Sequence, residues 1–356
     1  MKVAIIGAGI SGLAAAFEFK RHNITPVIFE KKSHIGNPVL FTSATLHIFN
    51  HFMSDPFCYL KKNYGLNISP TFQLKKLIMS SPQNKAVIKG NLGYIVNRMR
   101  EEGSLANQLF SKVALPIEFN SFVDINDIKE AFDYIIVATG SNLIAKDLNL
   151  WTNTFSAQIR SATIVGNFDT QSVLMWLNKD YAKDGFGYLI PTRPKEATLN
   201  LAVNNITFHE IDYYWENFLY REDLNYKIIE TRDASFECGF LSTHQLDNLY
   251  FTGNTAGFTD SLIGFGQIKA IESGILAARA IVNNLDYNKL VAPIARDMLK
   301  INEFRKILNS FSNKDLDKLL SFLKLPVIKQ LIYNNPFFKI KYGTFIAKLY
   351  NKFINN

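Results

Sequence analysis

Three glycines and one acid near the N-terminus carry the clearest chemical signal of this sequence. Gly7, Gly9 and Gly12 form a G-x-G-x-x-G pattern, and Glu30 lies 18 residues beyond Gly12. In this spacing the first glycine permits a tight turn, the second lets the backbone approach a pyrophosphate, and the third lets a helix pack close to a strand. A carboxylate at the position of Glu30 can accept hydrogen bonds from ribose hydroxyls. Together these residues predict a dinucleotide-binding site.

The segments around these glycines predict the elements that such a site needs. The apolar run at 2–6 predicts a strand, the small residues after the glycines predict a helix, and residues 25–29 predict a second strand. The helix N-terminus offers unpaired N–H groups and a partial positive charge to a phosphate. Met1-Lys2 and the Ala14–Ala16 run also resemble a signal peptide. The glycine spacing and the continuing βαβ pattern favour a nucleotide-binding unit instead.

Two later segments predict further strands of the same sheet. Residues 132–140 and 248–257 each combine an apolar run with a glycine turn, and a small-residue helix is expected at 264–282. Continuous apolar strands of this kind are typical of a parallel sheet covered on both faces. We expect an α/β fold, α+β overall, with a Rossmann-like parallel-sheet domain, an inserted antiparallel-sheet domain and a helical C-terminal tail.

Shorter segments predict the antiparallel part. Residues 72–80 and 85–89 flank a Ser-Pro-Gln-Asn turn and predict a hairpin. Other expected elements are strands at 161–165, 185–191, 197–203 and 205–211, a short helix at 210–220, and a mostly helical tail from about 291 that breaks at Pro326 and Pro336. The expected domains are a nucleotide-binding domain of residues 1–70, 91–150 and 240–290, an antiparallel substrate domain of 71–90 and 151–239, and a basic helical segment of 291–356.

Composition excludes several classes of protein. Two cysteines, Cys58 and Cys238, are too few for a disulfide framework, so we expect a reducing compartment, the cytoplasm. No apolar run approaches the roughly 18 residues that a spanning helix needs, and no metal-binding spacing occurs. Of the net charge of +8, residues 301–356 contribute ten Lys/Arg against three Asp/Glu. This concentration in one segment, with no nucleic-acid-binding motif beside it, argues against a nucleic-acid partner.

The three glycine-turn segments together resemble those of FAD-dependent oxidoreductases. The pattern joins the N-terminal G-x-G-x-x-G, a central Ala138-Thr139-Gly140 and a late Gly253-Asn254 turn, as in the para-hydroxybenzoate hydroxylase type of the glutathione-reductase superfamily. Within it, residues 186–191 are similar to a substrate-cavity stretch of the geranylgeranyl reductase family. Residues 251–257, 262–267 and 272–274 are similar to that family's flavin-binding turn and helix. The resemblance covers roughly residues 1 to 285.

The resemblance implies a role for each residue of the expected FAD site. Glycines and Ser11 of the first turn would hold the pyrophosphate, with Arg98 near the phosphates, Glu30 and Lys31 at the ribose and the Val123 backbone at the adenine. Asn254 would meet the ribityl chain, and Gly266-Gln267 the O2/N1 edge of the isoalloxazine. The expected set is Gly7, Ala8, Gly9, Ser11, Gly12, Glu30, Lys31, Arg98, Val123, Ala138, Gly140, Gly253, Asn254, Gly266 and Gln267.

Several positions depart from the family pattern. Asn254 stands where the family usually has Asp, Asn200-Leu-Ala202 replaces a Gly-x-Gly, and Tyr188 takes a Trp position. The family's cysteine is absent, because residues 41–43 read Phe-Thr-Ser. These departures bear on the substrate and the reaction rather than on FAD.

Catalytic residues are less well defined, with four weak candidates. Cys58 has apolar neighbours, which favours a buried, inert thiol. His47 and His51 would share a face if helical, where they could line a cleft, donate a proton or bind a metal, although no third ligand is visible. Tyr188 could donate a proton, and simple packing is favoured.

The C-terminal segment and the aromatic content each allow two interpretations. The amphipathic, lysine-rich tail could be a solvated cap over the substrate domain or could dock on an anionic membrane surface at the inner face of the membrane. The 29 Phe and 15 Tyr residues could form an ordinary core or a long apolar cavity for a lipid-like substrate.

The leading hypothesis is an FAD-dependent reductase that transfers hydride from flavin N5 to a carbon–carbon double bond of a hydrophobic, isoprenoid substrate. A second G-x-G-x-x-G is absent, so the electron donor would be ferredoxin, another partner or transiently bound NAD(P)H. The alternatives are a flavin monooxygenase of the same fold and a non-catalytic flavin- or lipid-binding protein.

Overall fold

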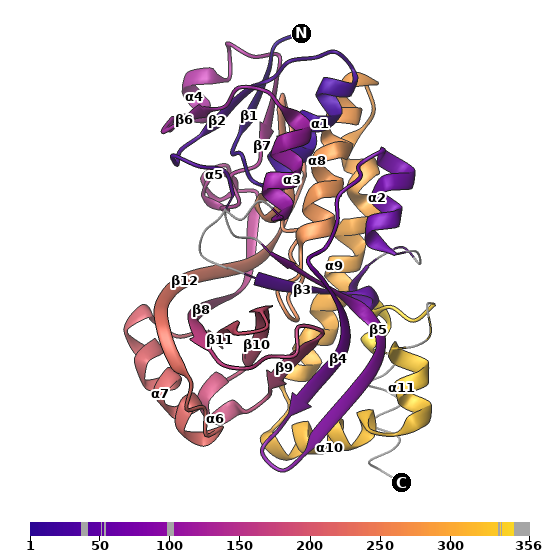
Figure 1. The fold of residues 1–356 in the computed structure, drawn as a ribbon. Helices are drawn as coiled ribbons and strands as arrows, with labels where there is room; N and C mark the ends of the chain where they lie inside the picture. Colours follow the sequence, from indigo (N-terminus) through magenta and orange to yellow (C-terminus); the bar gives the residue numbers. More distant parts are fainter. Residues whose placement is uncertain are drawn as a thin grey trace.

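The computed structural model describes residues 1–36, 42–50, 52, 55–97, 103–333, 335 and 337–344. Its described elements build two sheets and a C-terminal group of helices (Figure 1). This arrangement confirms the expected fold class, a parallel Rossmann-like sheet with an antiparallel sheet and a helical C-terminal part.

The parallel sheet contains the dinucleotide-binding pattern. Its strand order is β13-β14-β7-β1-β2-β6, and every neighbouring pair is parallel except β13 with β14. Helices α1 (Ile10–Arg21) and α8 (Gln267–Val282) pack on each other beside this sheet, with α3 (Leu105–Val113) next to α1. The strands are β1 (Val3–Ile6), β2 (Val27–Glu30), β6 (Glu118–Phe119), β7 (Tyr134–Val137), β13 (Gln245–Leu246) and β14 (Leu249–Phe251).

The second sheet is assembled from two distant stretches of chain. Its order is β12-β8-β11-β10-β9-β4-β5-β3, and a parallel pairing of β4 with β9 joins the two antiparallel halves. The first half contains β3 (Thr42–Leu46), β4 (Phe72–Ser80) and β5 (Lys85–Asn97). The second contains β8 (Trp151–Val165), β9 (Ser172–Trp176), β10 (Phe186–Arg193), β11 (Glu196–Asn204) and β12 (Lys227–Leu241).

Two groups of helices cover the second sheet. Short α6 (Lys179–Ala182) and α7 (Ile211–Arg221) pack on the β8–β11 part. The C-terminal helices α9 (Tyr287–Asn309), α10 (Asn313–Leu323), α11 (Pro326–Tyr333) and the 3-10 turn η4 (Ile340–Tyr342) follow, and side chains from α10, α11 and η4 join the core under β4 and β5. The described part of the tail is therefore a cap on this sheet. Remaining helices are α2 (Pro56–Tyr64), α4 (Ile125–Ile128) and α5 (Leu143–Asp147), with 3-10 turns η1 (His47–Phe49), η2 (Phe208–Glu210) and η3 (Gly253–Ala256).

Close packing of α1 on α8 depends on small residues and one buried charge. An ideal Cβ at Gly274 would lie 3.0 Å from the carbonyl carbon of Ser11 and 3.2 Å from the backbone nitrogen of Ala15. Glu18, with 1% of its surface exposed, accepts hydrogen bonds from Arg279 at 2.7 Å and Arg21 at 2.8 Å. Because both oxygens are paired with guanidinium groups, the carboxylate is stable inside this interface.

Some expected elements differ from the structure. Residues 42–46 fall within the stretch expected to be nucleotide-binding, yet β3 pairs antiparallel with β5 in the second sheet. The strand expected at 205–211 is wrong, because Asn205 adopts a positive φ of 55° that ends β11 and a Thr207–Glu210 capping box then begins the turn before α7. Arg98, expected near the cofactor phosphates, lies outside the described residues. None of the described helices is long and apolar enough to cross a bilayer.

Candidate active site

The turn between β1 and α1 has the geometry of a phosphate cradle. Gly7 has φ of 105° and donates its N–H to the Phe29 carbonyl at 2.7 Å, which holds the turn beside β2. Gly9 occupies the N-cap of α1, and an added Cβ there would meet no atom within 4 Å. The backbone at Gly9 therefore borders open space at a helix N-terminus, as the binding of a pyrophosphate requires.

Glu30 is held rigidly at the end of β2. Its side chain is 7% exposed, and Oε2 accepts a hydrogen bond from the Ala8 N–H at 2.8 Å while Oε1 accepts one from Lys32 at 3.0 Å. Each carboxylate oxygen retains a second lone pair that could receive a ribose hydroxyl. Lys31 is exposed, and half-buried Val123 lies two residues beyond Ser121, whose N–H bonds the Glu30 carbonyl at 3.0 Å.

The other two glycine turns meet at the same edge of the sheet. Ala138 follows β7, and the next glycine, Gly140, donates its N–H to the Thr255 hydroxyl at 3.0 Å. Gly253 has φ of 61°, and an ideal Cβ on it would stand 2.8 Å from Ser11 Oγ. Three segments that are distant in sequence thus converge at the carboxyl ends of β1, β7 and β14, where open α/β sheets bind their ligands.

The loop before α8 is shaped by a buried acid that sequence reasoning missed. Asp260 Oδ1 accepts hydrogen bonds from the N–H groups of Leu262 at 3.0 Å and Ile263 at 2.8 Å, and Oδ2 accepts one from Phe265 at 2.7 Å. Burial raises the pKa of Asp260, while Lys269 on α8 opposes this shift. An acid followed by Ser and a glycine-containing turn is an Asx-turn signal that could have identified the residue.

Asn254 and Gln267 occupy the two ends of that loop. Asn254 Oδ1 accepts a hydrogen bond from the Thr259 hydroxyl at 2.7 Å. Gly266 is the N-cap of α8, and the Gln267 amide donates to the Ser43 hydroxyl of β3. The N-terminus of α8 therefore lies at the junction of the two sheets, where its partial positive charge can stabilise an anionic group.

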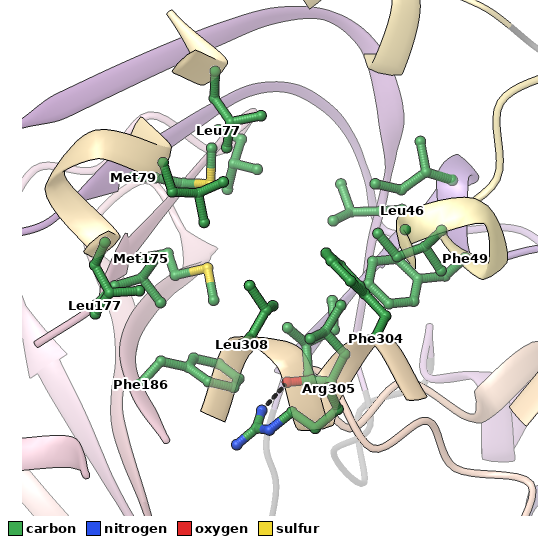
Figure 2. A pocket seen from close by; sticks show the side chains of 18 of the residues that line it. Leu46, Phe49, Leu77, Met79, Met175, Leu177, Phe186, Phe304, Arg305 and Leu308 are labelled. Atoms are coloured by element: carbon green, nitrogen blue, oxygen red, sulfur yellow. Dashed lines mark hydrogen bonds between the residues drawn. The ribbon is translucent and has the colours of Figure 1, made fainter. Parts of the chain in front are cut away.

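A cavity of about 180 Å³ lies between the second sheet and the C-terminal helices. Met79 of β4 and Met175 of β9 face Phe304 and Leu308 of α9 across it (Figure 2). Leu262 and Ile263 of the loop before α8 also line the cavity. The loop that leads into the α8 N-terminus is therefore also a wall of the cavity.

Arg305 anchors the polar end of this cavity. The residue is 5% exposed, and its guanidinium donates to the Leu262 carbonyl at 2.7 Å, to Asn309 Oδ1 at 2.6 Å and to the Asp184 carbonyl. Figure 2 marks one hydrogen bond of this guanidinium. Lys179 pairs with Asp184 beside it. Both cations are therefore hydrogen-bonded or ion-paired within the protein. Most of the other residues that line the cavity are apolar.

Three of the four catalytic candidates, His47, Cys58 and Tyr188, are described by the structure, and none of them is among the residues that line the cavity. Tyr188 is half-buried on β10 with its ring 5.4 Å from that of Phe186, which does line it. His47 begins a 3-10 turn rather than an α-helix, and burial lowers its pKa. His51 lies outside the described residues. The buried thiol expected at Cys58 is wrong, because Cys58 is exposed on the outer face of α2.

Comparisons with known proteins agree on the fold. Residues 5–45 match the family model of the NAD(P)-binding Rossmann-like domain. The chain is 23% identical to digeranylgeranylglycerophospholipid reductase 2 of Methanothermobacter thermautotrophicus over 90% of this chain and 91% of that protein. It is 24% identical to the enzyme of the same name from Methanosphaera stadtmanae, over 96% and 98%.

Solved structures extend this likeness. A geranylgeranyl bacteriochlorophyll reductase-like protein of Thermoplasma acidophilum superposes with a TM-score of 0.74 at 17% identity, covering 92% of each chain. A flavin-dependent halogenase superposes with a TM-score of 0.64 at 16% identity, over 89% of this chain and 67% of that one. At these identities the structural likeness shows a shared fold, which serves more than one reaction.

Proposed function

We propose that this chain, a Rossmann-like FAD/NAD(P)-binding oxidoreductase related to the digeranylgeranylglycerophospholipid reductases, reduces a carbon–carbon double bond of a hydrophobic, isoprenoid substrate with FAD as cofactor. The observation that carries the proposal is the apolar cavity whose wall includes Leu262 and Ile263, next to the N-terminus of α8. A site for an apolar chain and an expected site for the flavin ring thus share one loop. The names of the relatives support the substrate class.

The residues present fit both the adenosine end and the isoalloxazine end of FAD. Open space at Gly9 and the α1 N-terminus suit the pyrophosphate, and the buried Glu30 carboxylate suits the adenosine ribose. Gly266 and Gln267, at the N-terminus of α8, would bind the O2/N1 edge of the isoalloxazine, where reduction places negative charge. When bound, the flavin supplies the hydride through N5.

The chain's own side chains position the substrate and keep water away. The cavity lining is mostly aliphatic and aromatic, so it selects by shape and by the hydrophobic effect rather than by hydrogen bonds. Reduction of an alkene also needs a proton for the second carbon. Tyr333 of α11 lines the cavity and carries a hydroxyl that is protonated at neutral pH, so it can donate a proton there. We assign the proton-donor role to Tyr333 rather than to Tyr188, His47 or Cys58.

The experiment that tests this function begins with the absorption spectrum of the purified protein before and after dithionite, with the released cofactor identified. The proposal expects FAD and a bleachable flavin spectrum. The reduced protein is then incubated without oxygen with a geranylgeranyl-substituted glycerophospholipid, and mass spectrometry should show two added hydrogens per reduced double bond.

Two results would contradict the proposal. A colourless protein that does not take up FAD would remove the flavin, and substrate-dependent oxygen consumption with a hydroxylated product would establish a monooxygenase instead. Trials with NAD(P)H and with reduced ferredoxin in place of dithionite would identify the class of electron donor.

A further inference from the structure

Helix α11 is apolar on two opposite faces. Ile332, 4% exposed, and Tyr333 line the cavity on one side. Val327 and Leu331, four residues apart and so on one face, are 76% and 37% exposed. A helix whose only role was to cap the core would carry polar residues on this outer face, so the exposed apolar side chains require another explanation.

The exposed apolar face extends beyond the helix itself. Leu325, just before α11, is 38% exposed, and Phe337, shortly after it, is 67% exposed. We call Leu325, Val327, Leu331 and Phe337 the α11 surface. Figure 1 shows α11 at the periphery of the molecule, beside β5.

The stretch of chain that holds most of the α11 surface is basic. Residues 318–333 contain three lysines, Lys318, Lys324 and Lys329, and no aspartate or glutamate. Lys318 and Lys324 are exposed just before α11, and Lys329 is half-buried on the helix. Apolar side chains mixed with lysines are typical of helices that lie in the interface of an anionic bilayer, which attracts the lysines near its surface.

We propose that the α11 surface docks on an anionic phospholipid bilayer. The three lysines of residues 318–333, with no acid among them, favour this occupant over a second copy of the chain, since two such surfaces would bring like charges together. Docking in this way places one helix, about 10 Å thick, between the bilayer and the cavity. The entry of a lipid substrate along α11 rests on the proposed function, whereas docking itself does not.

The test measures binding to vesicles without substrate or reductant. Wild type is sedimented with vesicles of phosphatidylcholine alone and of phosphatidylcholine with phosphatidylglycerol, at low and high salt. We expect binding to the anionic vesicles that weakens with salt. The double variant Val327→Glu/Leu331→Glu should bind at least about tenfold more weakly, because two apolar contacts become charged. The matched control is Tyr213→Glu/Tyr220→Glu on α7, where the side chains are 67% and 86% exposed.

A second variant keeps the test independent of folding defects. Val327→Trp adds a fluorophore at the centre of the α11 surface, and brominated phosphatidylglycerol should quench the added emission. Lack of wild-type binding to anionic vesicles, equal binding by the double glutamate variant, or no quenching would each overturn the proposal. A change in oligomeric state without a change in vesicle binding would identify a second copy as the occupant.

Reductase activity separates this proposal from the proposed function. With detergent-dispersed substrate the double glutamate variant should turn over as wild type does, and with substrate in anionic vesicles it should be at least about tenfold slower. Vesicle binding without any reductase activity would leave the docking intact and refute the function alone.

Discussion

The contact between α1 and α8 at Gly274 makes a quantitative prediction for Gly274→Ala. The added methyl would stand 3.0 Å from the Ser11 carbonyl carbon and closer still to its oxygen, whereas carbon contacts are optimal at about 3.5–4.0 Å. Both helices are buried here, so they must separate. Overpacking of this kind costs about 1–3 kcal/mol, and the better helix propensity of alanine offsets roughly 1 kcal/mol of it.

We therefore expect Gly274→Ala to lower the free energy of unfolding by up to about 2 kcal/mol and, because Ser11 lies in the first turn of α1, to weaken FAD binding at least about tenfold. Urea unfolding measures the first quantity, and quenching of flavin fluorescence measures the second. Gly103→Ala is the control, since its Cβ would meet no atom within 4 Å and its φ is not positive. A Gly274→Ala protein as stable as wild type, with unchanged FAD affinity, would refute this account of the helix contact.

Four further predictions concern the site and one buried histidine outside it. Glu30→Gln should weaken ADP binding in calorimetry and lower stability by about 1–3 kcal/mol, because one of two backbone N–H groups loses its acceptor; unchanged values would contradict the role of the carboxylate. Burial lowers the pKa of His244 to about 4, so stability should fall by up to about 3 kcal/mol as pH drops from 6.5 to 4, and His244→Phe should abolish that slope in urea titrations. Met79→Trp should fill the cavity and reduce kcat/KM at least about tenfold with FAD binding intact, whereas Tyr333→Phe should lower kcat with little change in KM; neither effect would appear if the substrate binds elsewhere.

The parallel sheet could be predicted from short stretches of sequence, because each of its nucleotide-binding turns is encoded by a few consecutive residues. A glycine turn after an apolar strand has few alternative structures, and β1, β7 and β14 each end in one. The long strand β12 (Lys227–Leu241) was missed because most of its side chains are exposed or only partly buried, so no apolar alternation marks it. Strand β12 is stabilised by its antiparallel pairing with β8, and the sequence of β12 alone does not indicate this pairing.

The cavity could not be predicted because distant segments form it. Its wall combines β4, β9, the loop before α8 and the C-terminal helices, and no single segment has a distinctive motif. Tyr333 and Arg305 lie in the basic tail, where composition indicated charge rather than a site. Conversely, Cys58 has apolar neighbours in the sequence, yet its thiol is exposed. The helical periodicity of α2 places Phe57, Leu60 and Tyr64 on the buried face and Cys58 on the opposite face.

The pairing of Glu18 with Arg279 has a consequence for synthesis on the ribosome. The two residues are 261 positions apart, and β14, which completes the parallel core of the sheet, ends only at Phe251. During synthesis the nucleotide-binding domain therefore stays incomplete until most of the chain has left the ribosome. Such long-range closure slows folding and leaves strand edges unpaired. We infer that the protein folds as a late, cooperative unit, and that truncation before α8 leaves α1 without its partner.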